Sequence, residues 1–295
     1  MAVTIMKCEL VGAPDLSCAD TTCYELPPEE EAEVLGFLAE RAIHTVFMAT
    51  LVRDNGLVSP RNRGLFYGCR DRAGKLEGVA LIGHATIIEA RTDSAVAAFA
   101  QLAAHTEHAY LIRGERKIVD QFWRVYAVPA QQPRLICREL LFEKIDAAID
   151  YEPIDGLRPA TLDDIEHVLN VNTLLAFEEG GVSPIQRDPA GFRARTTRRI
   201  QQGRVWLWMR DGQPIFKADL LGDTPEMIYL EGIHVHPQQR SKGYGRRCLA
   251  QLSSVLTRRS RSICLTVNQR KADAVAFYVK AGFDFHSEYE TIYLR

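Results

Sequence analysis

Apolar residues in the second half of the chain follow the periods of both strands and helices. Short apolar runs alternate with segments whose apolar residues recur every three or four positions. We expect strands at Val205–Arg210, Ile215–Leu221, Met227–His236, Ser262–Val267 and Phe283–Tyr293, and helices from Thr161, at Pro189–Gln201, at Gly245–Thr257 and at Ala272–Ala281. Hairpins precede strand–helix alternation, which predicts a mixed α/β sheet, antiparallel first and parallel at its middle.

The first half has a similar order of elements. We expect helices at Glu29–Arg41, Asp93–Ala104 and Glu115–Tyr126, and strands at Leu65–Cys69, Gly78–Ile82, Ala85–Ile88, Ala109–Ile112 and Leu135–Phe142. The charged stretch Lys144–Asp155 contains a proline and opens no new period. We therefore predict two domains, residues 1–150 and 151–295.

Composition agrees with two globular domains. The chain has 295 residues, of which 46% are hydrophobic and 25% charged, close to the averages for globular proteins. No apolar run reaches the roughly 20 residues of a membrane span, and Met1–Pro14 lacks the apolar core of a signal peptide. We expect a cytoplasmic protein that does not bind membranes.

The seven cysteines are scattered, without a Cys-x-x-Cys pair. This pattern favours free thiols in a reducing compartment and indicates no metal site. The net charge of −2 predicts no general attraction to nucleic acid. The charge is divided unevenly, −5 before Tyr151 and +3 after it, and a mildly basic second half suits a phosphate-bearing ligand.

A loop rich in glycine and basic residues lies between a predicted strand and a predicted helix. It consists of Arg240, Ser241, Lys242, Gly243, Tyr244 and Gly245. Glycines let backbone amides approach an anion, and a helix N-terminus adds partial positive charge. The loop is suited to a pyrophosphate, although many strand-to-helix turns contain glycines only for flexibility.

A second motif follows in the right order. Asn268 ends a strand, and the next helix contains Ala274 and the pair Phe277–Tyr278 before Gly282–Phe283. Together, Arg-x-x-Gly-x-Gly and Asn-x-x-x-x-x-Ala-x-x-Phe-Tyr-x-x-x-Gly-Phe resemble the GNAT superfamily of N-acetyltransferases over residues 157–295. The resemblance implies an α/β fold of two tandem GNAT-like domains, each a mixed, mostly antiparallel twisted sheet flanked by helices. It also implies acetyl-CoA as co-substrate, without a metal.

The resemblance assigns roles to individual residues. The amides of Arg240–Gly245 would bind the pyrophosphate, and the backbone of Ile233, His234 and Val235 would pair with the pantetheine arm. Asn268 would lie beside that arm. Tyr278 falls where family members often place the tyrosine that protonates the departing CoA thiolate.

The strand Met227–His236 contains a carboxylate among apolar residues. Strand alternation places Tyr229, Glu231, Ile233 and Val235 on one face. A buried carboxylate is costly unless it is solvated or functional. The resemblance puts a general base at Glu231 or Tyr229, which an amine needs because it is mostly protonated at neutral pH. The alternative is a rim carboxylate paired with an arginine. His234 and His236, on the other face, are interpreted as structural.

Two further segments lie where the superfamily builds its acceptor side. The segment Glu178–Pro184, predicted to be a loop, could meet a cationic acceptor or be simply solvated. Four arginines on the next helix could guide CoA phosphate, but a solvated face is favoured: Arg193, Arg195, Arg198 and Arg199.

The first half lacks a phosphate loop at the equivalent junction. Residues Ile88–Ser94 contain no glycine, and Glu89 and Asp93 would repel a phosphate. We predict that the first half is a degenerate GNAT-like domain that binds no CoA and forms one wall of the acceptor cleft. The alternative is an unrelated α/β domain that only stabilises the chain. The whole chain is expected to acetylate an amine, on a small molecule or a protein. The alternatives are a non-catalytic acyl-CoA sensor and transfer to a hydroxyl or thiol.

Overall fold

The fold is described from a computed structural model that covers residues 22–106, 109–127, 132–145 and 152–294. The predicted boundary near residue 150 lies outside these ranges. None of the helices they contain is long and apolar enough to cross a membrane.

The first half contains six strands and four α-helices in the described residues. The strands are β1 (Thr22–Glu25), β2 (Gly64–Arg70), β3 (Leu76–Gly83), β4 (Ala85–Ala90), β5 (Leu111–Glu115) and β6 (Leu135–Lys144). The helices are α1 (Glu31–Ala39), α2 (Ala42–Asn55), α3 (Asp93–Ala104) and α4 (Arg116–Tyr126), with 3₁₀ turns at Pro28–Glu30 and Pro60–Asn62.

The second half follows the predicted order closely. Its strands are β7 (Arg158–Pro159), β8 (Val205–Arg210), β9 (Gln213–Asp223), β10 (Ile228–Val235), β11 (Ile263–Asn268) and β12 (Asp284–Tyr293). Its helices are α5 (Ile165–Gly180), α6 (Pro184–Arg187), α7 (Pro189–Gln201), α8 (Tyr244–Leu256) and α9 (Ala272–Lys280), with 3₁₀ turns at Leu162–Asp164 and Pro237–Gln239.

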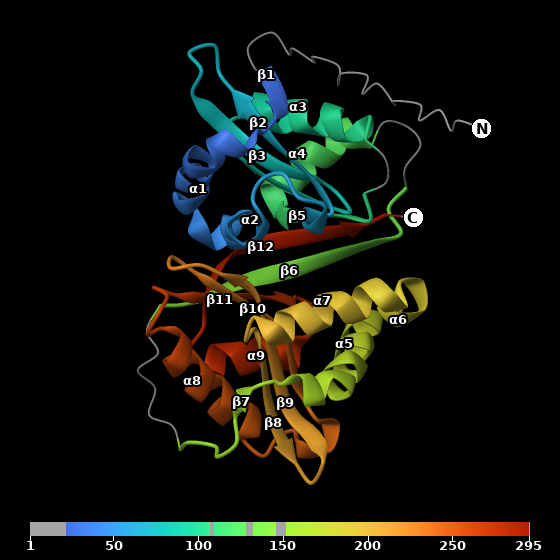
Figure 1. Ribbon diagram of the computed structural model, residues 1–295, viewed down its shortest axis with the longest axis vertical. Coiled ribbons are helices and arrows are strands. Elements are labelled where there is room, and N and C mark those ends of the chain that lie inside the picture. Colours follow the sequence, from blue (N-terminus) through green and yellow to red (C-terminus); the bar gives the residue numbers. More distant parts are fainter. Residues whose placement is uncertain (1–21, 107–108, 128–131, 146–151, 295) are drawn as a thin grey trace, which may run out of the picture.

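All described strands form one sheet, in the order β1-β2-β3-β4-β5-β12-β6-β11-β10-β9-β8-β7. The two halves exchange strands at its centre: β12 pairs with β5 of the first half, and β6 pairs with β11 of the second. Figure 1 shows β12 and β6 side by side between the two halves, and they pair along most of their length. Each half therefore contributes one strand to the sheet of the other half: β12 lies next to β5, and β6 lies next to β11.

The pairing confirms the predicted fold class. Strands are antiparallel except at β4–β5 and β10–β11, which lie near the middle of each half. In the first half, α3 and α4 pack on one face of the sheet and α1 and α2 on the other. In the second, α8 and α9 cover one face, and α5 and α7 lie on the other (Figure 1).

Three predictions for the first half are corrected by the structure. The helix expected at Glu29–Arg41 ends at Ala39, and a second helix, α2, follows directly. It contributes Val46 to a cluster with β10 and β12, so tertiary packing stabilises it. The first element predicted begins at Glu29, but β1 precedes it at Thr22–Glu25. The strand expected at Ala109–Ile112 is shifted to Leu111–Glu115, where β12 pairs with it.

Two cysteines contradict the prediction of free thiols. Cys23 and Cys69 are direct partners in the β1–β2 ladder, with Cα atoms 4.3 Å apart, and form a disulfide. They are 46 positions apart in sequence, and only the pairing of the strands brings them together. Cys137, Cys248 and Cys264 are free.

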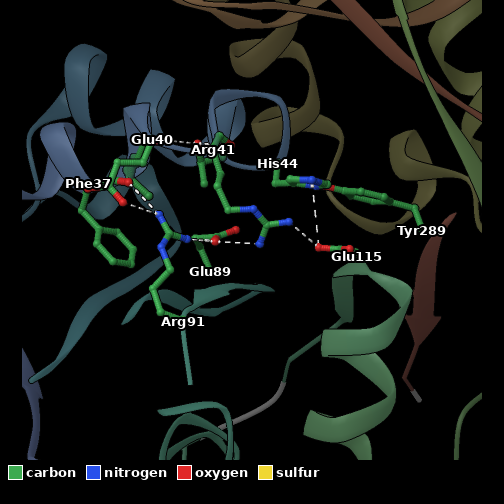
Figure 2. A network of polar contacts seen from close by, with 10 residues as sticks. Phe37, Glu40, Arg41, His44, Glu89, Arg91, Glu115 and Tyr289 are labelled. Carbon is green, nitrogen blue, oxygen red and sulfur yellow. Dashed lines mark hydrogen bonds and ion pairs between the residues drawn. The ribbon is translucent and has the colours of Figure 1, made fainter. Parts of the chain in front are cut away.

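A polar network joins α2 to the central strands (Figure 2). Arg41 donates to Glu89 at 3.0 Å and to Glu115 at 2.6 Å, and Arg91 also pairs with Glu89. Burial raises the pKa of Glu89, although the two guanidinium groups oppose this shift. Glu89, which was predicted to repel phosphate, is thus paired with two arginines inside the fold. The N-terminus of α3 is capped by Thr92.

Candidate functional site

Strands β10 and β11 separate at the centre of the second half. They pair in parallel at three positions, the last being Leu230 with Leu265. Both strands continue beyond this point, to Val235 and Asn268, without pairing with each other. Both lie wholly within the described residues. The separation leaves backbone groups of β10 unpaired on that side, which an extended ligand could use as a strand would.

A β-bulge interrupts β10 at the same point. Glu231 pairs with Asp219 on β9, but His234 pairs with Lys217, so one extra residue lies on β10 between them. Gly232 has φ +56°, and a Cβ there would lie 2.8 Å from the ammonium nitrogen of Lys217. The bulge requires a glycine for both reasons.

The bulge corrects the predicted faces of this strand. Ile233 and Val235 pack against the same cluster as Leu230, whereas Glu231 lies on the opposite face. An extra residue reverses the alternation beyond it, so simple period-two counting fails. His234 is buried, and burial lowers its pKa to about 4, as expected for a structural histidine.

The glycine loop leads into α8 as predicted, after a 3₁₀ turn. Ser241 and Gly243 have φ values of +62° and +78°, and no side chain caps the helix. A Cβ at Gly245 would lie 2.9 Å from a methyl carbon of Val235, so this glycine allows the helix to approach β10. Arg240 donates to the carbonyl of Val235 at 3.1 Å, and Lys242 to Gln239 at 2.9 Å. The uncapped amides remain suited to an anion.

A cavity of about 410 Å³ lies where β10 and β11 separate. We call it the transfer cavity. From the second half it is lined by Glu231, Asn268 and Tyr278, among others. Arg113 on β5 and Glu139 on β6 come from the first half. Both halves therefore build one site.

Glu231 is paired with an arginine, as in the alternative considered from sequence. Arg199 on α7 donates to Glu231 Oε1 at 2.9 Å and to Asp219 at 3.2 Å. Burial alone would lower the pKa of Arg199, but these two carboxylates outweigh burial and raise it. Lys217 donates to Asp219 at 2.5 Å and is also bonded to Asn172. Within the described chain, Glu231 Oε2 accepts no hydrogen bond.

The two tyrosines of the site differ in their contacts. Tyr229 is buried, and its hydroxyl accepts from Arg113 at 2.6 Å and lies 2.9 Å from that of Thr266. These bonds favour a role in holding Arg113. The hydroxyl of Tyr278 has no hydrogen-bond partner among the described residues. Burial raises the pKa of Tyr278, and the charge of Glu179 adds to this, so the phenol keeps its proton at neutral pH.

Acidic residues close the other end of the transfer cavity. Glu178 and Glu179 lie in the last turn of α5, not in a loop as predicted, and the helix ends at Gly181 with φ +68°. Glu179 remains accessible to solvent, but the surrounding walls and the charge of Glu231 raise its pKa. Both residues line the transfer cavity.

Sequence reasoning missed several residues of the site. Arg199 was assigned to a solvated face, which fits Arg193, exposed and paired with Glu166. Arg195 is also exposed and pairs with Asp188, but it lines the cavity as well. Arg198 instead donates to Asn55 on α2 at 2.7 Å. Residues from β5, β6 and β12 have no local sequence signal, because strand exchange alone brings them to the cavity.

Comparison with known proteins agrees with this architecture. Residues 171–283 match the acetyltransferase (GNAT) family. This segment of the second half belongs to the GNAT family. No curated protein matches the chain.

Solved GNAT structures share the fold over nearly the whole chain. One is a GNAT-family acetyltransferase from Colwellia psychrerythraea, with 10% identity and a TM-score of 0.54, which covers 92% of this chain and 99% of its own. A tandem GNAT protein from the clavulanic acid biosynthesis pathway has 12% identity and a TM-score of 0.58. The match covers 92% of this chain and 98% of the other. A GCN5-related N-acetyltransferase from Sphaerobacter thermophilus has 12% identity and a TM-score of 0.55. The match covers 92% of this chain and 94% of the other. These likenesses confirm the α/β GNAT fold in tandem.

No group of residues in the described ranges could hold a metal ion. The groups that could bind a co-substrate are the amides at the start of α8 and the unpaired edge of β10. Both groups are suited to an extended, anionic ligand, and Glu231 lines the cavity beside them.

Proposed function

We propose that the protein is an acetyl-CoA-dependent N-acetyltransferase that acts on an amine of a small molecule or a protein. One observation carries the proposal: β10 and β11 separate beside an uncapped glycine loop, and Glu231 and Tyr278 line the cavity at that point. The pantetheine arm would pair with the backbone of Ile233–Val235 and pass Asn268. The pyrophosphate would bind the amides of Arg240–Gly245.

The proposed chemistry is direct attack of the amine on the thioester carbonyl. Glu231, through its free Oε2 or one water molecule, would accept the proton of the amine. A backbone N–H near Ile233 would stabilise the oxyanion. The C–S bond then breaks, and Tyr278 donates its proton to the departing thiolate. Arg199 would hold the carboxylate of Glu231 in place through the bond to Oε1.

A covalent cysteine intermediate is disfavoured. Cys137 lines the transfer cavity, but burial raises the pKa of its thiol, and the thiolate is the nucleophilic form. Cys248, on α8, is buried in the core, where burial raises its pKa to about 12. Neither thiol is activated.

Two other functions lead to different results. A non-catalytic acyl-CoA sensor would bind the thioester but would not need both a carboxylate and a free phenol at the cavity. An acyltransferase for hydroxyls or thiols would use the same groups on another acceptor. Incubation with acetyl-CoA and sets of amines, alcohols, thiols and protein lysates, with detection of acetylated products by mass spectrometry, separates the three. Acetyl-CoA binding without any product would contradict the proposal.

We further propose that the protein works without nucleic acid or membrane partners. The net charge of −2 and the absence of a long apolar run support this proposal.

A further inference from the structure

A second cavity, of about 240 Å³, adjoins the transfer cavity. We call it the annex. The two cavities share lining residues, including Ala176, Glu179 and Tyr293. No residue of β10, β11, α8 or α9 lines the annex, so it lies on the acceptor side of the site. A molecule whose reactive end is in the transfer cavity could extend into it.

Three arginines and two carboxylates, Asp188 and Glu179, line the annex, so positive charge exceeds negative charge there. Arg63, from the first half, lines it with Arg187 and Arg195 from the second. Arg195 pairs with Asp188 at 2.9 Å. Within the described residues, Arg63 and Arg187 form no ion pair with any carboxylate. Burial lowers the pKa of Arg63, and the charges of Arg195 and Arg187 lower it further, as expected where cations outnumber anions.

Arg63 is held by an unusual backbone conformation. Its φ of +57° lies in the left-handed region, which costs a residue other than glycine about 1–2 kcal/mol. Its carbonyl accepts the N–H of His84 at 2.9 Å, and a Cβ at Gly83 would lie 2.4 Å from that carbonyl oxygen. Such strain often marks functional positions. Ser241, in the proposed pyrophosphate loop, is also left-handed.

Aromatic side chains contact Arg187, the second arginine of the annex without an ion pair among the described residues. The guanidinium of Arg187 lies 4.4 Å from the ring centroid of Tyr110, and His84 stacks on Tyr110 at 5.1 Å. Burial lowers the pKa of His84 to about 4, and Arg63 and Arg187 add to this. His84 is therefore neutral at neutral pH and keeps one ring N–H to donate. The annex offers fixed donors to an anion.

We infer that the annex binds an anionic group, a carboxylate or a phosphate, carried by the same acceptor whose amine lies against Glu231. Guanidinium groups bind both anions through paired hydrogen bonds. This inference rests on the proposed N-acetyltransferase function and narrows its substrate class: the acceptor is an amine joined by a spacer to an anionic end. Arg63, His84 and Tyr110 give the first half a part in selecting it.

The test uses matched acceptors that differ only at the far end. We would compare ω-amino acids of increasing chain length, their carboxamides and the corresponding aminoalkyl phosphates, measuring CoA release with a thiol reagent. A charge-assisted bond predicts that kcat/KM falls about tenfold or more when the carboxylate becomes an amide. Equal rates for acids, phosphates and amides would overturn the inference. The better of the two anionic series identifies the anion.

Variants locate the effect. Arg63→Gln and Arg187→Gln should each lower kcat/KM for the anionic acceptors by about tenfold or more, mainly through KM, because a charge-assisted bond is lost. Rates with the amides should not change. Arg61→Gln is the control, because Arg61 is exposed two positions from Arg63 and does not line the annex. Loss of the amide reaction to the same extent would contradict the inference.

A binding measurement separates this inference from the proposed function. N-acetylated ω-amino acids and their amides are added to the CoA-bound protein and followed by saturation-transfer NMR. Binding of the acids that depends on Arg63 supports the annex even if no amine is acetylated, in which case only the proposed function fails. Equal binding of acids and amides would rule out the annex as an anion site.

Discussion

The guanidinium of Arg199 lies 2.9 Å from Oε1 of Glu231 and 3.2 Å from Asp219, so one cation on α7 holds two carboxylates from neighbouring strands. The pairing holds Oε1 of Glu231, a residue that lines the transfer cavity, and leaves Oε2 without a hydrogen bond among the described residues. The same pairing offers an alternative to a general base, in which Glu231 only holds Arg199 in place.

Substitution of Glu231 distinguishes the two roles. Glu231→Gln keeps the shape and removes the proton acceptor, so kcat should fall about 10²–10⁴-fold, the usual contribution of a general base. Affinity for acetyl-CoA, measured by calorimetry, should stay nearly constant. Glu226→Gln is the control, since Glu226 lies outside the cavity and pairs weakly with Arg53 at 3.7 Å. Full activity of Glu231→Gln from about pH 6 to 9 would show that Glu231 only anchors Arg199.

Gly243 tests the pyrophosphate loop. Gly243→Asp places a negative charge at the start of α8, where the ligand's own charge should lie, and calorimetry should show that CoA binding is lost. The backbone strain of the change is matched by Gly74→Asp in a distant hairpin, because both glycines have positive φ and no atom within 4 Å of a Cβ. Equal CoA affinity in the two variants would place the phosphates elsewhere.

Tyr278→Phe tests proton return to CoA. The variant removes a phenol whose raised pKa keeps it protonated, and kcat should fall about 10²-fold or more while CoA affinity is retained. Tyr24→Phe is the control, because its hydroxyl bonds Glu30 in the first half, away from the cavity. An unchanged kcat in a single-turnover experiment would mean that the thiolate leaves unprotonated.

The strand exchange predicts that neither half is stable alone. A chain beginning at Tyr151 would lose β6, leaving β11 without its partner at six positions and β12 unpaired on both sides. Such open edges favour aggregation. We expect this fragment to be insoluble alone and to recover when residues 1–150 are co-expressed, as judged by gel filtration. A soluble, monomeric fragment would contradict the structure.

The disulfide predicts sensitivity to reduction. Cys23→Ala, or reduction of the protein, should lower the free energy of unfolding by about 2–4 kcal/mol, the usual range for a loop of this length. Urea denaturation measures the loss, and peptide mass spectrometry without reductant should find Cys23 joined to Cys69. Reduction should not change the stability of the Cys23→Ala variant, which serves as the control. Recovery of both cysteines as free thiols would contradict this pairing.

Three histidines with lowered pKa values predict how stability depends on pH. Burial lowers the pKa of His44, His84 and His234 to about 4 in the folded protein, against about 6.5 when unfolded. Between these values the unfolded chain binds more protons, so unfolding should become easier as pH falls from about 6.5 toward 4. Urea titrations across this range, with His84→Gln expected to flatten the curve, would show it. A stability that rises on acidification would contradict the assignment.

The sequence determined the features that depend on local order. The helix that begins at Tyr244 and the strands around Glu231 and Asn268 follow from apolar period and glycine placement, which neighbouring residues set by themselves. The order of the two motifs was sufficient to identify the superfamily, which the comparisons support. The match to a tandem GNAT structure also agrees with the predicted fold class.

Only the tertiary structure decided how the two halves form one site. The bulge at Gly232 reverses the faces of β10, and the pairing of β12 with β5 brings Arg113 and Tyr293 to the cavity. Strand pairing joins residues far apart in sequence, as it does for Cys23 and Cys69, and no local period encodes it. Arg199 shows the same limit, since a helix pattern gives the spacing of its charges but not which carboxylates they meet. The cation-rich annex therefore follows from the packing of the two halves and not from either half alone.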